Sequence, residues 1–263
     1  MGLRMNFKIY PDSRIGRLPK PFQLFALVVR NLSPIKFKFR YKFDGIATAH
    51  NLSFINESRF KFALENSTRA GGHDYKIYLR LHQALWCADL ARKISKEAAF
   101  VELGTGKGFL MSGVLSALEY PSKEDTKQVT YLFDTFVPYK TDFKSNQDYE
   151  YGTHPHYADS LQQVQKTFAK FPNTKLIPGR LPESLNNVEI NQISFLHIDL
   201  NAPEIEIASL KLLWDKILPG GVILIDDYAY AGYDYTYELF NKFAIDFKVS
   251  ILTTASGQGI ILK

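Results

Sequence analysis

The chain has 263 residues, of which 46% are hydrophobic and 22% charged, a composition that suits a globular protein with a substantial core. Its single cysteine, Cys87, excludes an internal disulfide and a multi-cysteine metal cluster, and its apolar helical setting predicts a buried, inert thiol. The single cysteine also fits a reducing, cytoplasmic compartment. No apolar run approaches the roughly 18–20 residues of a membrane span, and no signal peptide is expected.

The net charge of +5 is unevenly distributed along the chain. Residues 1–43 hold ten Lys and Arg against one acid, Asp12, and we expect them to form a basic N-terminal arm. Within the arm, residues 36–43 alternate cation with aromatic, which is typical of a strand with one apolar and one cationic face. A solvated surface strand, a base-stacking nucleic-acid contact, and a contact with an anionic substrate or membrane surface all suit that strand. The arm would also suit a contact between the subunits of a homo-oligomer.

Residues 44–96 are predicted to form a helical segment that lies over a substrate. Between residues 78 and 94, apolar side chains recur at spacings of three and four, which gives one apolar stripe on a helix. These residues are Tyr78, Leu81, Leu85, Trp86, Ala88, Leu90 and Ile94. The pair Gly71-Gly72 is expected to separate this helix from a preceding one.

Residues 97–263 alternate strand-like with helix-like segments and are expected to form the catalytic domain. Strands are predicted at residues 98–103, 129–133, 174–177, 193–198, 222–225, 249–252 and 259–262. Amphipathic stretches lie at 110–118, 157–171, 205–217 and 235–243. The alternation predicts an α/β fold with a Rossmann-like, doubly wound, mostly parallel seven-stranded sheet. The last two strands have no room for a crossover helix between them and should form a terminal antiparallel hairpin.

A glycine-rich turn follows the first strand of this domain. Glu102 precedes Gly104, Thr105 and Gly106 in a G-x-G-x-G spacing at the start of a helix. Glycines let a backbone approach a ligand closely, and a helix N-terminus offers free N–H groups. The carboxylate is unsuited to a pyrophosphate and suits the amino group of a cationic cofactor, which disfavours NAD and FAD.

Acidic residues end three further strands. Asp134, followed by Thr135, ends the second strand, where a carboxylate can accept hydrogen bonds from a ribose diol. Asp199 ends the fourth strand, and Asp226 and Asp227 end the fifth. If these two strands are neighbours, the three acids converge, and oxygen ligands of this kind suit Mg²⁺ or Ca²⁺. A single acid at a strand end is also a common turn cap.

Three histidines lie near these motifs. His154 and His156 have a spacing found in metal sites, although a loop containing Pro155 is more often exposed to solvent. His197 lies on the same strand face as Asp199 and could assist it, but a buried, hydrogen-bonded histidine suits that position better.

The motifs together resemble those of class I S-adenosylmethionine (SAM)-dependent methyltransferases, and among them the macrocin O-methyltransferase-like family, which methylates sugar hydroxyls of natural products. The resemblance covers residues 44–263 and depends on the order and spacing of several short motifs. They start at Asp44, Tyr78, Val101, Leu132, His197, Pro219, Asp226 and Gly257. Residues 1–43 have no counterpart.

The resemblance implies a role for each of these site residues. Glu102, Gly104, Thr105 and Gly106 would bind the methionine part of SAM, Asp134 and Thr135 the ribose, and Gly179 and Arg180 the adenine. Asp199, Asp226 and Asp227 would hold Mg²⁺ beside an acceptor hydroxyl, with Asp199 also next to the cofactor. Asn201 departs from the pattern, because many relatives carry a second acid there.

The sequence therefore predicts a Mg²⁺-assisted O-methyltransferase that acts on a small-molecule hydroxyl, possibly of a carbohydrate. Asp199 or a nearby histidine, His154 or His156, would take the proton. A nucleic-acid methyltransferase that uses the basic arm is disfavoured because no target-recognition motif is visible. A non-catalytic binding module is disfavoured because Glu102, Asp134 and the three acids are intact.

Overall fold

The computed structural model describes residues 39–122, 127–136 and 160–263. The chain divides into two compact units, one of residues 1–41 and 47–51 and the other of residues 42–46 and 52–263. In the first unit, the Arg40 N–H donates to the Thr48 carbonyl at 2.8 Å. The basic arm up to residue 38, including the start of the cation–aromatic alternation, lies outside the described residues.

A short hairpin carries the first acid of the second unit. Strands β1 (Tyr41–Phe43) and β2 (Ile46–Thr48) form a two-stranded sheet. Asp44 and Gly45 connect them with φ angles of 54° and 69°. A two-residue hairpin turn of type I′ needs positive φ at both positions, and Asp-Gly is a favoured pair for it. The turn therefore fixes the backbone conformation at Asp44.

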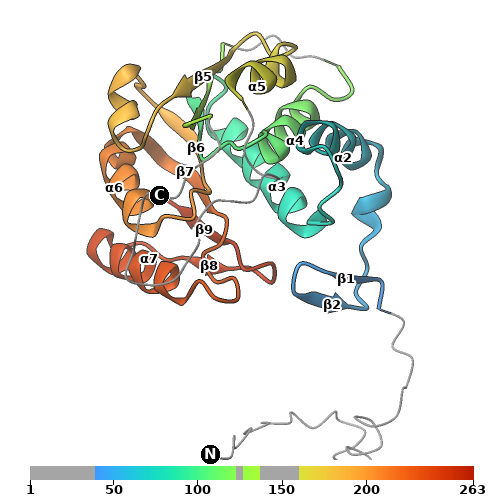
Figure 1. Ribbon diagram of the computed structural model, residues 1–263. Coiled ribbons are helices and arrows are strands. Elements are labelled where there is room, and N and C mark those ends of the chain that lie inside the picture. The colour runs from blue at the N-terminus through green and yellow to red at the C-terminus, as the bar shows by residue number, and fades with distance from the viewer. Residues whose placement is uncertain (1–38, 123–126, 137–159) are drawn as a thin grey trace, which may run out of the picture. The chain divides into compact units, whose positions relative to one another are not determined.

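The second unit is built on a seven-stranded sheet, which confirms the predicted α/β fold class (Figure 1). The strand order is β5-β4-β3-β6-β7-β9-β8, with β3 to β7 parallel and β9 antiparallel to both of its neighbours. The strands are β3 (Ala99–Leu103), β4 (Thr130–Asp134), β5 (Thr174–Pro178), β6 (Ile193–Ile198), β7 (Ile217–Ile225), β8 (Leu252–Thr253) and β9 (Gly259–Leu262). The strand order reverses between β3 and β6, and in open α/β sheets ligands bind beyond the strand ends at such a point.

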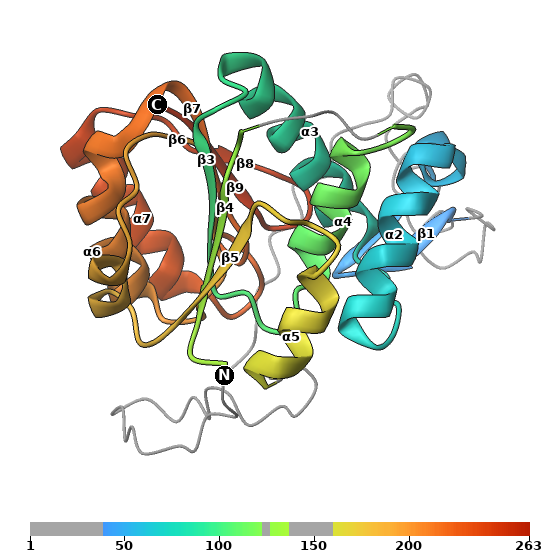
Figure 2. The same ribbon diagram turned by 90° about the horizontal axis from the view of Figure 1, so that it is seen from above.

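Helices cover both faces of this sheet. Figure 2 shows it edge-on, with α6 and α7 against one face and α3, α4 and α5 against the other. The helices are α2 (Ser58–Gly71), α3 (Tyr78–Ile94), α4 (Phe109–Leu118), α5 (Leu161–Phe168), α6 (Pro203–Leu213) and α7 (Asp234–Phe247). Short 3₁₀ turns lie at Ser53–Asn56, Glu183–Asn187 and Trp214–Lys216. The break predicted at Gly71-Gly72 is present, because Gly72 caps α2 in the left-handed conformation.

Two hydrophobic cores follow from this layering. Alternate residues of the central strands point to opposite faces, so Phe100 and Leu224 belong to the core beneath α3 and α4. Val101 and Ile223 belong to the core beneath α6 and α7. Strands buried on both faces need the continuous apolar runs that identified them in the sequence.

Two predicted strand starts were wrong by three residues or more. A strand was expected at residues 249–252, but β8 begins at Leu252. Lys248 takes the left-handed conformation at the end of α7, and the Val249 N–H donates to the Ala244 carbonyl, so Val249 belongs to the helix cap. The fifth strand was expected at 222–225, but β7 begins at Ile217, which pairs with Ile193 on β6. Gly220, with a φ of 77°, and Gly221 hydrogen-bond with Lys263, so the strand continues through this irregular segment.

Candidate active site

The carboxyl ends of the parallel strands bring the predicted site residues to one edge of the sheet. The Asp199 N–H donates to the Leu103 carbonyl at 2.8 Å, and the Asp226 N–H donates to the Ile198 carbonyl at 2.9 Å. The Gly104 N–H donates to the Phe133 carbonyl at 2.9 Å. Hydrogen bonding therefore continues just past the ends of β4, β3, β6 and β7, and the segments that carry the predicted residues stay side by side.

Gly104 allows the turn after β3 to lie directly against the end of β6. Its φ is 90°, and a Cβ atom built on it would come within 1.9 Å of the Asp199 carbonyl oxygen. No side chain fits between two backbones at that distance. The glycine turn therefore lies in contact with the segment that carries Asp199.

Asp134 ties the glycine turn to the end of β4. Its Oδ2 accepts a hydrogen bond from the Gly106 N–H at 2.8 Å, and its Oδ1 accepts one from the Phe136 N–H at 2.9 Å. The Thr135 hydroxyl lies 3.4 Å from Oδ1. Because each carboxylate oxygen can accept more than one hydrogen bond, Asp134 keeps acceptor capacity for a ligand.

Glu102 forms a buried pair with His197. The two residues are opposite each other on β3 and β6, both on the face covered by α3 and α4. His197 Nδ1 lies 3.0 Å from Glu102 Oε1, and the two side chains are 1% and 2% exposed. Among the described residues, Glu102 Oε2 and His197 Nε2 have no hydrogen-bond partner. Burial raises the pKa of Glu102, and the contact with His197 opposes that rise. The expectation that His197 is buried and hydrogen-bonded is confirmed.

Gly179 and Arg180 follow β5 at the same edge of the sheet. With Glu183, Ser184 and Asn187 they line a hollow of about 320 Å³. The Gly179 N–H donates to the Asp134 carbonyl at 3.0 Å, so the hollow adjoins the end of β4. Thr105, in the glycine turn, is buried and its N–H donates to the Phe133 carbonyl at 3.3 Å.

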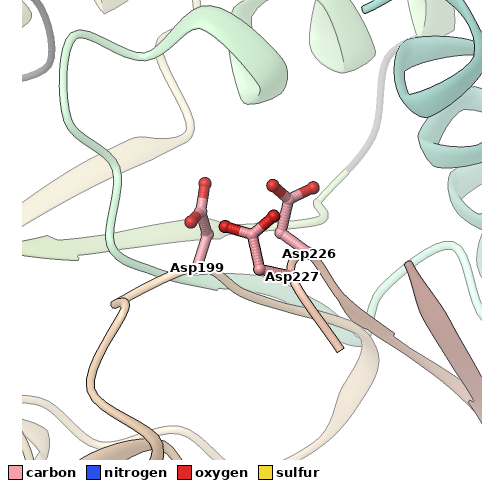
Figure 3. A group of neighbouring side chains, drawn as sticks. All are labelled: Asp199, Asp226 and Asp227. Atoms are coloured by element: carbon pink, nitrogen blue, oxygen red, sulfur yellow. The ribbon is translucent and has the colours of Figure 1, made fainter. Parts of the chain in front are cut away.

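Asp199, Asp226 and Asp227 converge as the sequence predicts. One carboxylate oxygen from each residue can be chosen so that all three lie within 4.8 Å of one another. Figure 3 shows the three carboxylates pointing to the same side, away from the strands that carry them. Burial raises the pKa of Asp199 well above its ordinary value, and the negative charges of Asp226 and Asp227 raise it further. A cluster of this kind needs positive charge close by to stay ionised.

Arg80 supplies part of that positive charge, a role that the sequence did not suggest. It lies in the first turn of α3 and is 5% exposed. Its Nη1 donates to Asp226 Oδ2 at 2.5 Å and to Asp227 Oδ1 at 2.8 Å. Its Nε and Nη2 donate to the two Asp44 oxygens at 2.9 and 3.1 Å. The pKa of Asp227 is raised by burial and by Asp226, while Arg80 lowers it.

Glu206 holds the loop between β6 and α6 in place. Its Oε1 accepts hydrogen bonds from the Leu200 N–H at 3.0 Å and the Ala202 N–H at 3.4 Å. Burial raises its pKa to about 7, despite these hydrogen bonds. Within the loop, Asn201 has a φ of 54° and accepts a hydrogen bond from the Tyr233 hydroxyl at 2.7 Å. Asn201, where the family resemblance led us to expect a second acid, therefore has a structural contact.

Arg80, Asp44, Gln258 and Glu206 were not predicted as site residues. The first three lie in short motifs that carry the family resemblance, but no role was assigned to them. Two of them carried a signal in the sequence. Arg80 is a charged residue on a helix with an apolar stripe, and Asp44 belongs to an Asp-Gly pair. Gln258 is fully buried, and its Nε2 donates to Asp226 Oδ1 at 2.7 Å.

Three further expectations concern residues elsewhere. His154 and His156 lie outside the described residues. Cys87 is buried, as expected, and burial raises the pKa of its thiol to about 12, which disfavours the reactive thiolate. Among the described helices, none is long and apolar enough to cross a membrane.

The strand order, the glycine turn after β3 and the acids that follow β4, β6 and β7 define an α/β domain of the methyltransferase type. Solved O-methyltransferase structures share this fold. NovP matches with a TM-score of 0.61 at 18% identity, over 81% of this chain and 99% of its own. CalS11, the calicheamicin methyltransferase, matches with a TM-score of 0.54 at 12% identity, over 97% and 94%. An O-methyltransferase from Bacillus cereus in complex with SAH (S-adenosylhomocysteine) matches with a TM-score of 0.51 at 13% identity, over 91% and 97%.

The sequence itself matches the model of one family. The model of the macrocin-O-methyltransferase (TylF) family matches residues 58–246. The chain belongs to this family and is an O-methyltransferase. A comparison with curated proteins found no match.

Proposed function

We propose that the chain transfers the methyl group of SAM to a hydroxyl of a sugar or a natural-product-like small molecule, with the assistance of Mg²⁺. One observation carries the proposal. The acidic cluster of Asp199, Asp226 and Asp227 lies at the same edge of the sheet as the glycine turn, with the Gly104 backbone in contact with Asp199. An acceptor held at the cluster would therefore lie next to a cofactor held at the turn.

The residues at the glycine turn fit SAM. The buried Glu102 Oε2 has no hydrogen-bond partner among the described residues and suits an ammonium group. Gly104, Thr105 and Gly106 offer close backbone approach, and Asp134 with Thr135 suits a ribose diol. The hollow beside Gly179 and Arg180 suits a flat base. When bound, SAM supplies a methyl group made electrophilic by its sulfonium, so the protein has to position the acceptor oxygen about 3 Å from it.

The acidic cluster fits a hard divalent cation. Asp199, Asp226 and Asp227 would hold Mg²⁺ through carboxylate oxygens, the donors that this ion prefers. When bound, Mg²⁺ supplies positive charge that favours the ionised acceptor hydroxyl. Arg80 contacts one oxygen each of Asp226 and Asp227 and so leaves them acceptor capacity.

Asp199 is proposed to take the proton of the acceptor hydroxyl on its carboxylate. Arg80 forms ion pairs with Asp44, Asp226 and Asp227, so within the described part of the chain Asp199 is the member of the cluster without an ion pair. Burial and the neighbouring acids raise its pKa, which makes the ionised carboxylate a stronger proton acceptor. His154 and His156 are the alternative bases.

The proposed acceptor class draws on the structural relatives as well as the site. CalS11 is described as a TDP-rhamnose 3′-O-methyltransferase, and its apo structure matches with a TM-score of 0.50. The vicinal hydroxyls of a sugar could both approach a cation at the cluster. A sugar nucleotide is therefore the first acceptor to test.

The test is methyl transfer from labelled SAM to TDP-rhamnose, with a catechol as the competing acceptor. Wild-type protein should methylate the sugar nucleotide in Mg²⁺ and lose activity in EDTA. Asp199→Asn should lose at least a hundredfold of the rate, the typical contribution of a general base. Activity unchanged in both EDTA and Asp199→Asn would exclude the metal-assisted mechanism and favour a histidine base.

A further inference from the structure

Arg80 joins three carboxylates that come from two distant segments of the chain. Asp44 lies in the turn between β1 and β2, whereas Asp226 and Asp227 follow β7. Four N–H bonds of the guanidinium are used, two on Asp44 and two from Nη1 on Asp226 and Asp227. The guanidinium carbon also lies 4.7 Å from the centre of the Tyr230 ring. Arg80 therefore has little freedom to move while Asp44 is present.

The position of Asp44 decides how strongly Arg80 acts on the other two acids. Asp44 binds Arg80 through both oxygens in the side-on geometry, and its side chain is 4% exposed. Its negative charge offsets the positive charge of the guanidinium. Asp226 and Asp227 thereby gain a fixed hydrogen-bond donor and keep most of their negative charge for a cation.

Gln258 completes the positioning of Asp226. Its Nε2 donates to Asp226 Oδ1 at 2.7 Å, while Arg80 donates to Oδ2. Both oxygens of Asp226 thus accept a hydrogen bond, and the rotation of the carboxylate is fixed. Residues that orient metal ligands in this way affect metal affinity strongly, typically by about 10- to 100-fold.

We infer that Asp44 and Arg80 form a counter-ion pair that positions Asp226 and Asp227 and sets the affinity of the acidic cluster for a divalent cation. The inference rests on the proposed function, because it needs a cation at the cluster. It assigns Asp44 and Arg80 as positioning residues, since neither would touch the cation or the acceptor. Loss of the Asp44 charge leaves the charge of Arg80 uncompensated beside the cluster and should weaken cation binding.

The test measures Mn²⁺ binding to the full chain by electron paramagnetic resonance, with calorimetric SAH binding as a second readout. Asp44→Asn removes the charge and keeps the turn, because Asn tolerates positive φ as Asp does. We expect Mn²⁺ binding to weaken by roughly 10- to 100-fold, while SAH affinity stays within about twofold. Asp89→Asn is the matched control. Asp89 binds Arg59 through both oxygens, at 2.6 and 2.7 Å, away from the cluster, so Mn²⁺ affinity should not change.

Each other outcome overturns the inference. Equal Mn²⁺ affinity in Asp44→Asn and wild type would show that the Asp44–Arg80 pair does not set the affinity, although the proposed metal site itself would stand. Parallel loss of Mn²⁺ and SAH binding shows a general loosening of the site instead. Absence of Mn²⁺ binding to wild type overturns both the inference and the metal-assisted function. If Asp44→Asn does not fold, Arg80→Lys replaces it. A lysine cannot bind Asp44 side-on and also reach Asp226 and Asp227, so Mn²⁺ binding should again weaken.

Discussion

Replacement of Gly104 by alanine tests the contact between the glycine turn and the end of β6. The added Cβ would lie 1.9 Å from the Asp199 carbonyl oxygen and 2.6 Å from its carbonyl carbon. Positive φ costs a non-glycine residue roughly 1–2 kcal/mol. A clash with a backbone that cannot rotate away adds about 1–3 kcal/mol, as overpacking typically does. We therefore expect Gly104→Ala to lower the free energy of unfolding by about 2–5 kcal/mol, together with loss of SAH binding.

Gly72→Ala provides the matched control for this substitution. Gly72 has a φ of 84°, close to the 90° of Gly104, but a Cβ there would meet nothing within 4 Å. It should therefore show the backbone cost alone, roughly 1–2 kcal/mol, with unchanged SAH affinity. Denaturant unfolding followed by circular dichroism gives both free energies. Equal destabilisation of the two variants would refute the idea that Gly104 is required by its contact with Asp199.

Two further predictions concern buried groups. The Cys87 thiol, with its pKa raised to about 12, should not react with Ellman's reagent in the native protein and should give one equivalent after unfolding; rapid native reaction would contradict the burial. For Glu206, the folded pKa of about 7 lies above the ordinary 4.5, so its contribution to stability is greatest below pH 4.5 and is lost as the pH rises to 7. As the pH rises from 4.5 to 8, the free energy of unfolding of Glu206→Gln should therefore increase relative to that of wild type by about 3 kcal/mol. Urea unfolding at several pH values measures this difference. A difference that does not depend on pH would contradict this.

The strands of the sheet could be predicted because each is marked by a pattern of neighbouring residues in the sequence. A strand buried on both faces needs a continuous apolar run, and β3, β6 and β7 each contain one. The acids after β4, β6 and β7 could be placed together because parallel strands end at the same edge. Strand boundaries were less certain where a cap decides them. Val249 is apolar like a strand residue, and its place in the cap of α7 depends on the left-handed Lys248.

The surroundings of the acidic cluster could not be read from the sequence. Arg80 is 36 positions from Asp44 and 146 from Asp226, so no local pattern relates the three. The pair of Glu102 and His197 depends on the register of β3 against β6, which a single sequence does not fix. The Asp-Gly pair at 44–45 indicates a hairpin turn, but only the folded structure shows that Asp44 pairs with Arg80.

Calorimetric titration with SAH tests the central claim most directly, because the acceptor need not be known. Wild-type protein should bind one equivalent, and Glu102→Gln and Asp134→Asn should each weaken binding by at least tenfold, the effect of losing one charge-assisted hydrogen bond. Lys175→Gln, a change near the amino end of β5 and away from the carboxyl ends of the strands, should bind as wild type does. No heat of binding to folded wild-type protein would contradict the assignment of this strand edge as a cofactor site.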